Sequence, residues 1–146
     1  MKVFKFGGAS VKDAAGVKNL SSIVHQQHGQ LIVVVSAMGK TTNLLETLCN
    51  AYFHQDPKAT AIMKELKDFH LNIVNSLFPL NDPVYKHLEE LFTNLENILA
   101  SESSLCYDYE YDRIICFGEL ISTTIISDYL KMKGIENQFI DIRTTL

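Results

Sequence analysis

The sequence predicts an α/β protein, with an open, mainly parallel sheet sandwiched by helices and a helical hairpin inserted between sheet elements. Two observations lead to this prediction. A β-prone run at residues 3–6 ends in Gly7 and Gly8 and is followed by apolar residues at helical spacing. An unbroken apolar, β-branched run at residues 31–35 ends in a second glycine turn, and another helical pattern follows it. Because crossovers between parallel strands are right-handed almost without exception, both glycine turns are expected at the same edge of the sheet.

The first helix is expected to begin at Ser10, whose hydroxyl can accept a hydrogen bond from an amide of the first turn, with Asp13 three residues later. Gly29 is expected to end this first helix. The run at 31–35 has the composition of a central strand that is buried on both faces, as strands in parallel sheets usually are.

Two amphipathic helices are expected next. One follows the break at Asp56 and Pro57 and stops before Pro79, and the second spans residues 83–101. They predict an antiparallel hairpin that acts as a cover or an interface and not as a separate domain.

The last third of the chain predicts one more helical region and a third strand. Residues 109–132 have a helical pattern with Gly118 in the middle. A glycine inside a helix costs about 1 kcal/mol relative to alanine, so Gly118 indicates a helix boundary or a close backbone approach. Residues 135–142 predict a third strand, and no helix follows to cover it, which is typical of a truncated chain.

Composition excludes several classes of protein. The net charge of −4 and the scattered lysines give no basic surface for nucleic acid. The longest apolar stretch is far shorter than the roughly 20 residues that span a bilayer, and no signal peptide is recognisable, so no membrane partner and a cytoplasmic location are expected. Three cysteines without a CxxC pair suit a reducing compartment and are expected to be core thiols.

The first turn has the parts of a phosphate-binding site. Lys5 stands at the end of a strand, Gly7 and Gly8 allow main-chain amides to face a common concavity, and Ser10 lies at a helix start. An ordinary strand-to-helix turn with a solvated lysine is the alternative on these residues alone.

The second turn also follows a strand and contains glycine, lysine and hydroxyl side chains. It is not a Walker A loop, because the pattern GxxxxGK[ST] requires a glycine where this chain has Val34. Ser36 and Thr42 are the hydroxyl donors best placed to bind a carboxylate or a phosphate. Simple helix capping is the alternative.

Glu119 follows Gly118 in an apolar neighbourhood and is expected to be buried, where an acid needs a cation. A ligand ammonium group or an internal Lys or Arg could supply it. The histidines lack metal-ligand spacing, so no protein-built metal site is expected, and no Ser-His-Asp triad can be inferred. The acidic, aromatic stretch at 107–112 is interpreted as a solvated helix entry.

Three segments in series, KFGGAS, VVVSAMGKTTNLL and FGELIS, resemble the aspartate kinases of the amino-acid-kinase family. The resemblance covers nearly the whole chain. It implies the carbamate-kinase-like fold of that family and transfer of the γ-phosphoryl group of ATP to the side-chain carboxylate of L-aspartate. The product, 4-phospho-L-aspartate, is the first intermediate toward lysine, threonine and methionine. The resemblance also implies Mg²⁺ bound with the nucleotide and a homo-oligomer for the full-length protein.

The resemblance also implies roles for individual residues. Lys5 would neutralise charge on the transferring phosphoryl group, and the amides of Gly7 and Gly8 would contact phosphate oxygens. Ser10 and Ser36 would line the same edge of the nucleotide site. Thr42 and Glu119 would bind the aspartate, with the glutamate pairing to its ammonium group.

Two departures from the family pattern limit the resemblance. Ala9 replaces the usual threonine or serine of the glycine motif, so a hydroxyl is missing there. The GRGGSD-type segment, the nucleotide-binding half and the ACT regulatory domains are absent. Residues 1–146 are therefore expected to be the amino-acid-substrate side of the catalytic domain and to be inactive alone. A non-catalytic α/β interaction module, or a kinase for another small acid such as glutamate or carbamate, remains the alternative.

Overall fold

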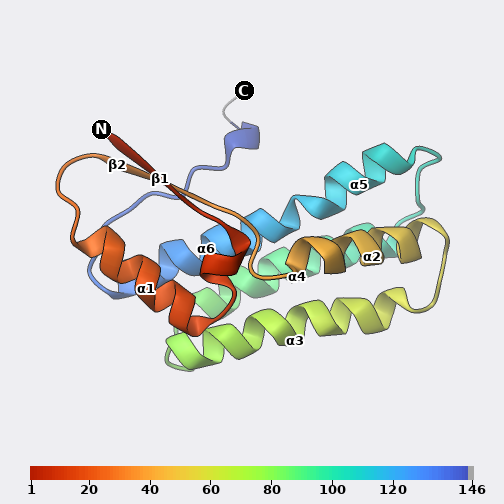
Figure 1. Cartoon of the computed structure of the whole chain (residues 1–146). Coiled ribbons are helices and arrows are strands. Elements are labelled where there is room, and N and C mark those ends of the chain that lie inside the picture. The colour runs from red at the N-terminus through yellow and green to blue at the C-terminus, as the bar shows by residue number, and fades with distance from the viewer. Residues whose placement is uncertain (145–146) are drawn as a thin grey trace.

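A computed structural model describes residues 1–144 of the chain. A two-stranded sheet lies above a layer of helices (Figure 1). The elements in chain order are β1 (Lys2–Phe6), the 3₁₀ turn η1 (Gly8–Val11), α1 (Ala14–His25), β2 (Leu31–Val35), α2 (Thr41–Phe53), α3 (Ala59–Leu77), α4 (Val84–Ala100), α5 (Tyr107–Ile115), α6 (Phe117–Met132) and the 3₁₀ turn η2 (Ile142–Thr144).

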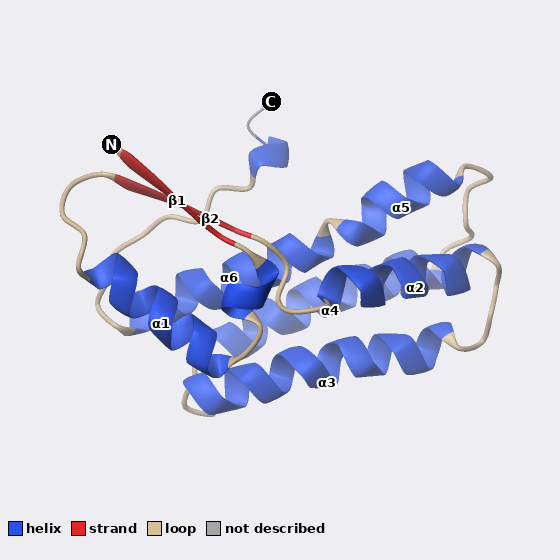
Figure 2. Cartoon of the chain, viewed as in Figure 1, coloured by secondary structure: helices blue, strands red, loops and turns tan. Residues whose placement is uncertain are grey.

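The two strands are parallel and aligned in register, with Lys5 opposite Val34 and Phe6 opposite Val35. The crossover through α1 therefore brings both strand ends to one edge, as predicted. Side chains alternate along β2, so that Ile32 and Val34 are 46% and 45% exposed while their neighbours are half-buried. Helices cover only one face of the sheet within residues 1–144 (Figure 2), so the prediction of a strand buried on both faces is wrong for this part of the chain.

The first helix begins later than its sequence predicted. The residues after the glycines form η1, and α1 starts at Ala14 with Asp13 as its N-cap, whose carboxylate accepts a hydrogen bond from the Gly16 amide at 2.8 Å. Ser10 is therefore not the cap. A Cβ atom at Gly16 would lie 2.3 Å from the Ser10 carbonyl oxygen, so η1 folds directly onto the start of α1.

The predicted helical hairpin is present. α3 and α4 run antiparallel, α2 packs on α3 and α5, and α4 packs on α6 (Figure 1). These contacts bury a single apolar core in the helical layer. Its largest fully buried apolar side chains are Leu20, Met38, Leu45, Leu48, Leu66, Leu88, Leu95, Ile114, Ile121 and Ile125. No helix of residues 1–144 combines the length and the apolar character that crossing a membrane requires.

The predicted third strand does not form. Residues 135–141 are irregular and pair with neither strand, and the exposed fraction of Ile140 is 63%. Instead, Asn137 anchors the segment to α6, since its amide donates to the Ser127 carbonyl oxygen at 3.1 Å and its Oδ1 accepts from the Ser127 hydroxyl at 2.7 Å. Each of the two strands has one unpaired edge within residues 1–144, but the hydrogen bonds of Asn137 hold this segment on α6.

The three thiols are free and differ in environment. Cys49 is buried and Cys116 is half-buried, but Cys106 is exposed beside the start of α5. The prediction of core thiols is wrong for Cys106.

Candidate functional site

The two glycine turns are joined by main-chain hydrogen bonds at the carboxyl edge of the strands. The Ser36 amide donates to the Phe6 carbonyl oxygen, and the Gly39 amide donates to the Gly8 carbonyl oxygen, each at 3.0 Å. A Cβ atom at Gly8 would lie 2.7 Å from the Ala37 carbonyl oxygen. Gly8 is thus required by the close approach of one turn to the other.

A third turn, at the start of α6, joins the same group. A Cβ atom at Gly118 would lie 2.8 Å from the Ala37 Cβ and 3.2 Å from a methyl group of Leu45, so α6 packs directly on the second turn. The Ser122 hydroxyl donates to the Ser36 carbonyl oxygen at 2.8 Å. The prediction of a helix boundary and a close backbone approach at Gly118 is confirmed, because α5 ends at Ile115 and α6 begins at Phe117. We call these three segments, residues 5–10, 36–42 and 117–122, the three-turn site.

Lys5 lies near the end of β1 and is the first residue of the three-turn site. It is exposed, on the face of the sheet that also presents Val3 and Val34 and that the helices leave open. It forms no ion pair with any of residues 1–144. Its positive charge is therefore available to a ligand at the carboxyl edge of the strands.

A profile of the amino acid kinase family matches residues 1–146. The chain belongs to the amino acid kinase family. Aspartokinase 2, chloroplastic, of Arabidopsis thaliana is 31% identical over 139 residues, which cover 90% of this chain and 25% of that protein. Lysine-sensitive aspartokinase 3 of Escherichia coli is 26% identical over 146 residues, which cover 99% of this chain and 31% of the relative. The chain thus spans a quarter to a third of the length of these curated relatives.

The fold is also that of a solved member of the family. The crystal structure of E. coli aspartokinase III in complex with aspartate and ADP superimposes with a TM-score of 0.85 at 25% identity, covering 98% of this chain and 31% of that one. The predicted α/β fold class is confirmed, with a small parallel sheet and many helices.

The hydroxyl side chains predicted for the kinase site differ in their exposure to solvent. Ser10 is exposed in η1, and Ser36 is half-buried between the turns. Thr42 is exposed in the first turn of α2, whereas the adjacent Thr41 is buried and its hydroxyl donates to the Met38 carbonyl oxygen at 2.6 Å. Thr41 therefore closes the second turn, and the Thr42 side chain is exposed to solvent.

Gly7 differs from Gly8 because the fold gives it no steric role. A Cβ atom at Gly7 would have no neighbour within 4 Å, and its φ of −74° is open to any residue. Neither packing nor backbone conformation within residues 1–144 requires glycine at this position. A ligand that approaches the main chain closely would require it.

Glu119 is exposed in the first turn of α6, so the prediction that it is buried is wrong. Its neighbours Gly118 and Ile121 turn into the core, and the glutamate stands on the opposite side of the helix. It forms no ion pair with residues 1–144, so the expected internal Lys or Arg partner is not found there. Its carboxylate is available to a ligand amine.

Cys116, three residues before Glu119, contacts Arg143. The Arg143 guanidinium donates to the Cys116 sulfur at 3.2 Å and holds the Asp141 carboxylate at 2.6 Å. Burial raises the pKa of the Cys116 thiol above its ordinary value, although Arg143 has a lowering effect. The thiol is therefore protonated at neutral pH and is not a nucleophile for the site.

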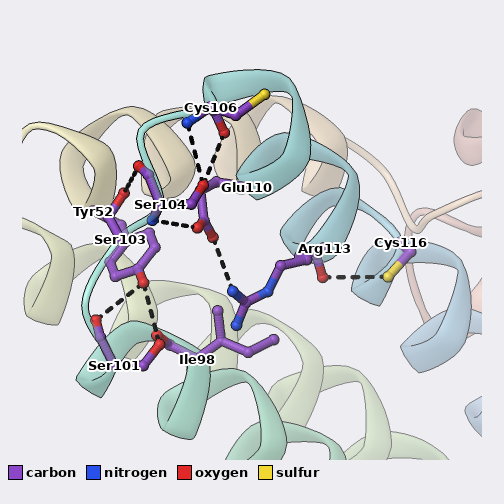
Figure 3. Close-up of polar contacts among 9 residues, drawn as sticks. All are labelled: Tyr52, Ile98, Ser101, Ser103, Ser104, Cys106, Glu110, Arg113 and Cys116. Carbon is purple, nitrogen blue, oxygen red and sulfur yellow. Dashed lines mark hydrogen bonds and ion pairs between the residues drawn. The ribbon is translucent and has the colours of Figure 1, made fainter.

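The buried acid of this region is Glu110, which the sequence interpretation placed on a solvated helix entry. Its side chain is fully buried. Oε1 accepts from the Ser104 amide at 2.7 Å, and Oε2 lies 3.4 Å from the Arg113 guanidinium (Figure 3). Oε2 has no hydrogen-bond partner among residues 1–144. The cluster holds the loop between α4 and α5. The spacing of Glu110 and Arg113 by one helical turn is the sequence signal that could have indicated the pair.

His70 was not assigned a role from sequence, yet it packs against the second turn from α3. It is fully buried on α3, its Nδ1 lies 2.8 Å from the Leu66 carbonyl oxygen, and its Nε2 lies 3.4 Å from the Thr41 hydroxyl. Burial lowers the pKa of His70 to about 4, against a smaller raising effect of the Leu66 hydrogen bond. It is neutral at physiological pH and serves the packing of the turn.

No group of three or more His, Cys, Asp or Glu side chains converges among residues 1–144 in a way that could hold a metal ion.

Proposed function

We propose that this chain provides the amino-acid-substrate side of an aspartate kinase, which transfers the γ-phosphoryl group of ATP to the side-chain carboxylate of L-aspartate and forms 4-phospho-L-aspartate. The observation that carries the proposal is the convergence of KFGGAS, SAMGKTT and FGELIS in the three-turn site. The named relatives are aspartokinases, and the superimposed E. coli enzyme was solved with aspartate and ADP.

The phosphoryl group is proposed to bind beside Lys5 and the first turn. Phosphoryl transfer depends mainly on positioning and on electrostatic stabilisation of the charge on the transferring group. Lys5 supplies an uncommitted positive charge, and the main-chain amides of Gly7 and Gly8 supply hydrogen-bond donors. The absence of a steric reason for glycine at position 7 supports close contact between its backbone and a phosphate oxygen.

The aspartate is proposed to bind between the second and third turns. The Glu119 carboxylate pairs with the substrate ammonium group, and the Thr42 hydroxyl donates a hydrogen bond to the substrate. Ser10 and Ser36 line the edge of the nucleotide site. Both Thr42 and Glu119 are exposed and lie in the first turns of α2 and α6, which meet where Gly118 packs against Leu45, and this supports their action on one ligand.

The proposal extends to the longer protein of which this chain resembles a part. We propose that it is a cytoplasmic homo-oligomer catalysing the first step toward lysine, threonine and methionine. Mg²⁺ enters with the nucleotide, where it would supply charge neutralisation of the phosphates. The residues described here form no site for it, and no step of the proposed mechanism is assigned to it.

Lys5→Ala in the full-length protein tests the proposal. Removal of a cation that stabilises the transferring phosphoryl group is expected to lower kcat by about 100-fold or more. Thermal unfolding is expected to stay unchanged because the side chain is exposed. Lys58→Ala removes an exposed lysine far along the chain and is the matched control. Unchanged turnover in the Lys5 variant would instead favour a non-catalytic interaction module, and turnover with glutamate or carbamate in place of aspartate would favour another substrate.

A further inference from the structure

A second feature, apart from the three-turn site, is a groove between α1 and the last turns of α6. Its volume is about 490 Å³, and its polar lining residues are Lys18, Ser21, Ser22, His25, Tyr129 and Lys133. Figure 1 shows α1 beside the end of α6, and the two helices are in contact. Gly118 and Tyr129 are eleven residues apart on α6, which places the groove roughly 15–20 Å along the helix from the three-turn site.

The groove is basic in a chain whose net charge is −4. Lys18, Lys133 and His25 are the ionisable groups of its lining apart from the Tyr129 phenol, and no Asp or Glu lines it. Neither lysine forms an ion pair with any of residues 1–144, and the Lys133 ammonium lies 5.6 Å from the centre of the Tyr129 ring. The neighbouring acid Asp128 is held by His87 at 2.6 Å. Two positive charges are thus left without a counter-ion.

Two largely buried residues in the same lining have hydroxyl groups without a protein partner. Tyr129 is 3% exposed and Ser21 is 7% exposed, and neither hydroxyl has a hydrogen-bond partner among residues 1–144. Both oxygens retain contact with the solvent of the groove, because neither is among the enclosed unpaired atoms. Both hydroxyls can therefore donate a hydrogen bond to an anion that replaces water in the groove.

We propose that this groove binds a small phosphate-bearing anion. A phosphate or phosphate monoester carries close to two negative charges at neutral pH, which matches the two lysines. Its oxygens accept hydrogen bonds from ammonium and hydroxyl donors, which are the groups that line the groove. The site is separate from the kinase site, whose phosphate-binding groups lie at the other end of the sheet.

Residue-resolved NMR of the ¹⁵N-labelled chain tests this proposal. Inorganic phosphate and glycerol 3-phosphate are titrated separately at constant ionic strength set with chloride. Saturable shifts of the amide signals of Ser21, Ser22 and Ile135 report the groove, and those of Gly7, Gly8 and Ser10 report the three-turn site. The two sites are therefore read independently, and loss of one leaves the other measurable. Tighter binding of the ester identifies an organic phosphate as the ligand, and equal binding identifies the free ion.

Three variants make the outcome specific. Lys18→Ala with Lys133→Ala is expected to weaken binding in the groove by about tenfold or more, because two charge-assisted hydrogen bonds are lost. Tyr129→Phe removes the unpartnered hydroxyl alone and is expected to weaken binding several-fold. Lys58→Ala with Lys86→Ala removes the same charge elsewhere and is expected to leave binding unchanged. Equal weakening by the control pair, or no saturable shift of the groove signals in the wild-type chain, would overturn the proposal.

Discussion

His70 connects α3 to the second turn, and its environment sets a pH dependence of folding. The folded protein keeps this imidazole neutral down to about pH 4, whereas an unfolded chain protonates it near its ordinary pKa of 6.5. The unfolded state therefore binds more protons between these values, so stability falls as the pH falls through this window and the loss from this residue is complete below pH 4.

His70→Gln isolates this effect because glutamine does not titrate. Between pH 7 and pH 5 the wild-type chain is expected to lose about 2 kcal/mol more free energy of unfolding than the variant, with carboxylate effects common to both. Urea unfolding at the two pH values measures the difference. Parallel losses in both proteins would show that His70 is not held neutral by burial.

Glu119 is the residue on which the choice of an amino-acid substrate depends. In the full-length protein, Glu119→Gln keeps the shape of the side chain and removes the charge that is proposed to pair with the substrate ammonium group. The KM for aspartate is expected to rise by about tenfold with a smaller change in kcat, because a charge-assisted hydrogen bond is lost. Glu136→Gln, another exposed acid, is the control. An unchanged KM in the Glu119 variant would remove this residue from the aspartate site.

Glu110 on α5 and Glu119 on α6 show where sequence patterns fail to predict the burial of single residues. Glu119 lies among apolar residues in the sequence, but its position on the helix turns it to solvent, while Glu110 in an acidic stretch turns into the core. The neighbourhood along the chain predicted both environments wrongly. Helical phase decides which side chain is buried, and phase depends on where α5 ends and α6 begins, which composition does not fix.

At the scale of elements, the two glycines of the first turn have different roles. Gly8 is required by packing against the second turn, whereas Gly7 is proposed to be required by a ligand. Gly7→Ala is expected to change the free energy of unfolding by less than about 0.5 kcal/mol, since its Cβ would meet nothing within 4 Å. Gly8→Ala is expected to cost about 1–3 kcal/mol, because its Cβ would clash with the Ala37 carbonyl oxygen at 2.7 Å. Chemical denaturation of both variants measures the difference between their free energies of unfolding.

Activity of the same two variants in the full-length protein completes this prediction. Gly7→Ala is expected to lower kcat even though the fold is intact, because the added methyl group occupies the approach to the backbone amide. A fully active Gly7 variant would mean that this turn is structural only, and equal stability of the two variants would contradict the packing role of Gly8.

Strands and helices with strong local patterns were predicted correctly from the sequence. β1, β2, the α3–α4 hairpin and the boundary at Gly118 follow from periodicity and from glycine and proline positions. The third strand and the helix start at Ser10 were wrong for different reasons. Residues 135–141 are held on α6 through Asn137 and pair with neither β1 nor β2. Ser10 is part of a 3₁₀ turn that packs on Gly16, a tertiary contact that the local sequence does not indicate.

At the scale of the whole molecule, the chain corresponds to only part of the relatives that it matches. It spans 25% of one aspartokinase relative and 31% of another, and Lys5 and Glu119 have no charged partners within residues 1–144. We expect the 146 residues alone to show no useful turnover, because they correspond to only a quarter to a third of the length of these aspartokinases. A coupled assay for ADP release with ATP, Mg²⁺ and aspartate measures this, and turnover comparable to that of the full-length protein would contradict it.

The most direct test is a crystal structure of the full-length protein with L-aspartate and ADP bound. The account predicts that the substrate ammonium group lies within hydrogen-bond distance of the Glu119 carboxylate, and that the Lys5 ammonium faces the space between the aspartate side chain and the ADP β-phosphate. Ligands bound away from the three turns, with Lys5 and Glu119 contacting neither, would contradict it.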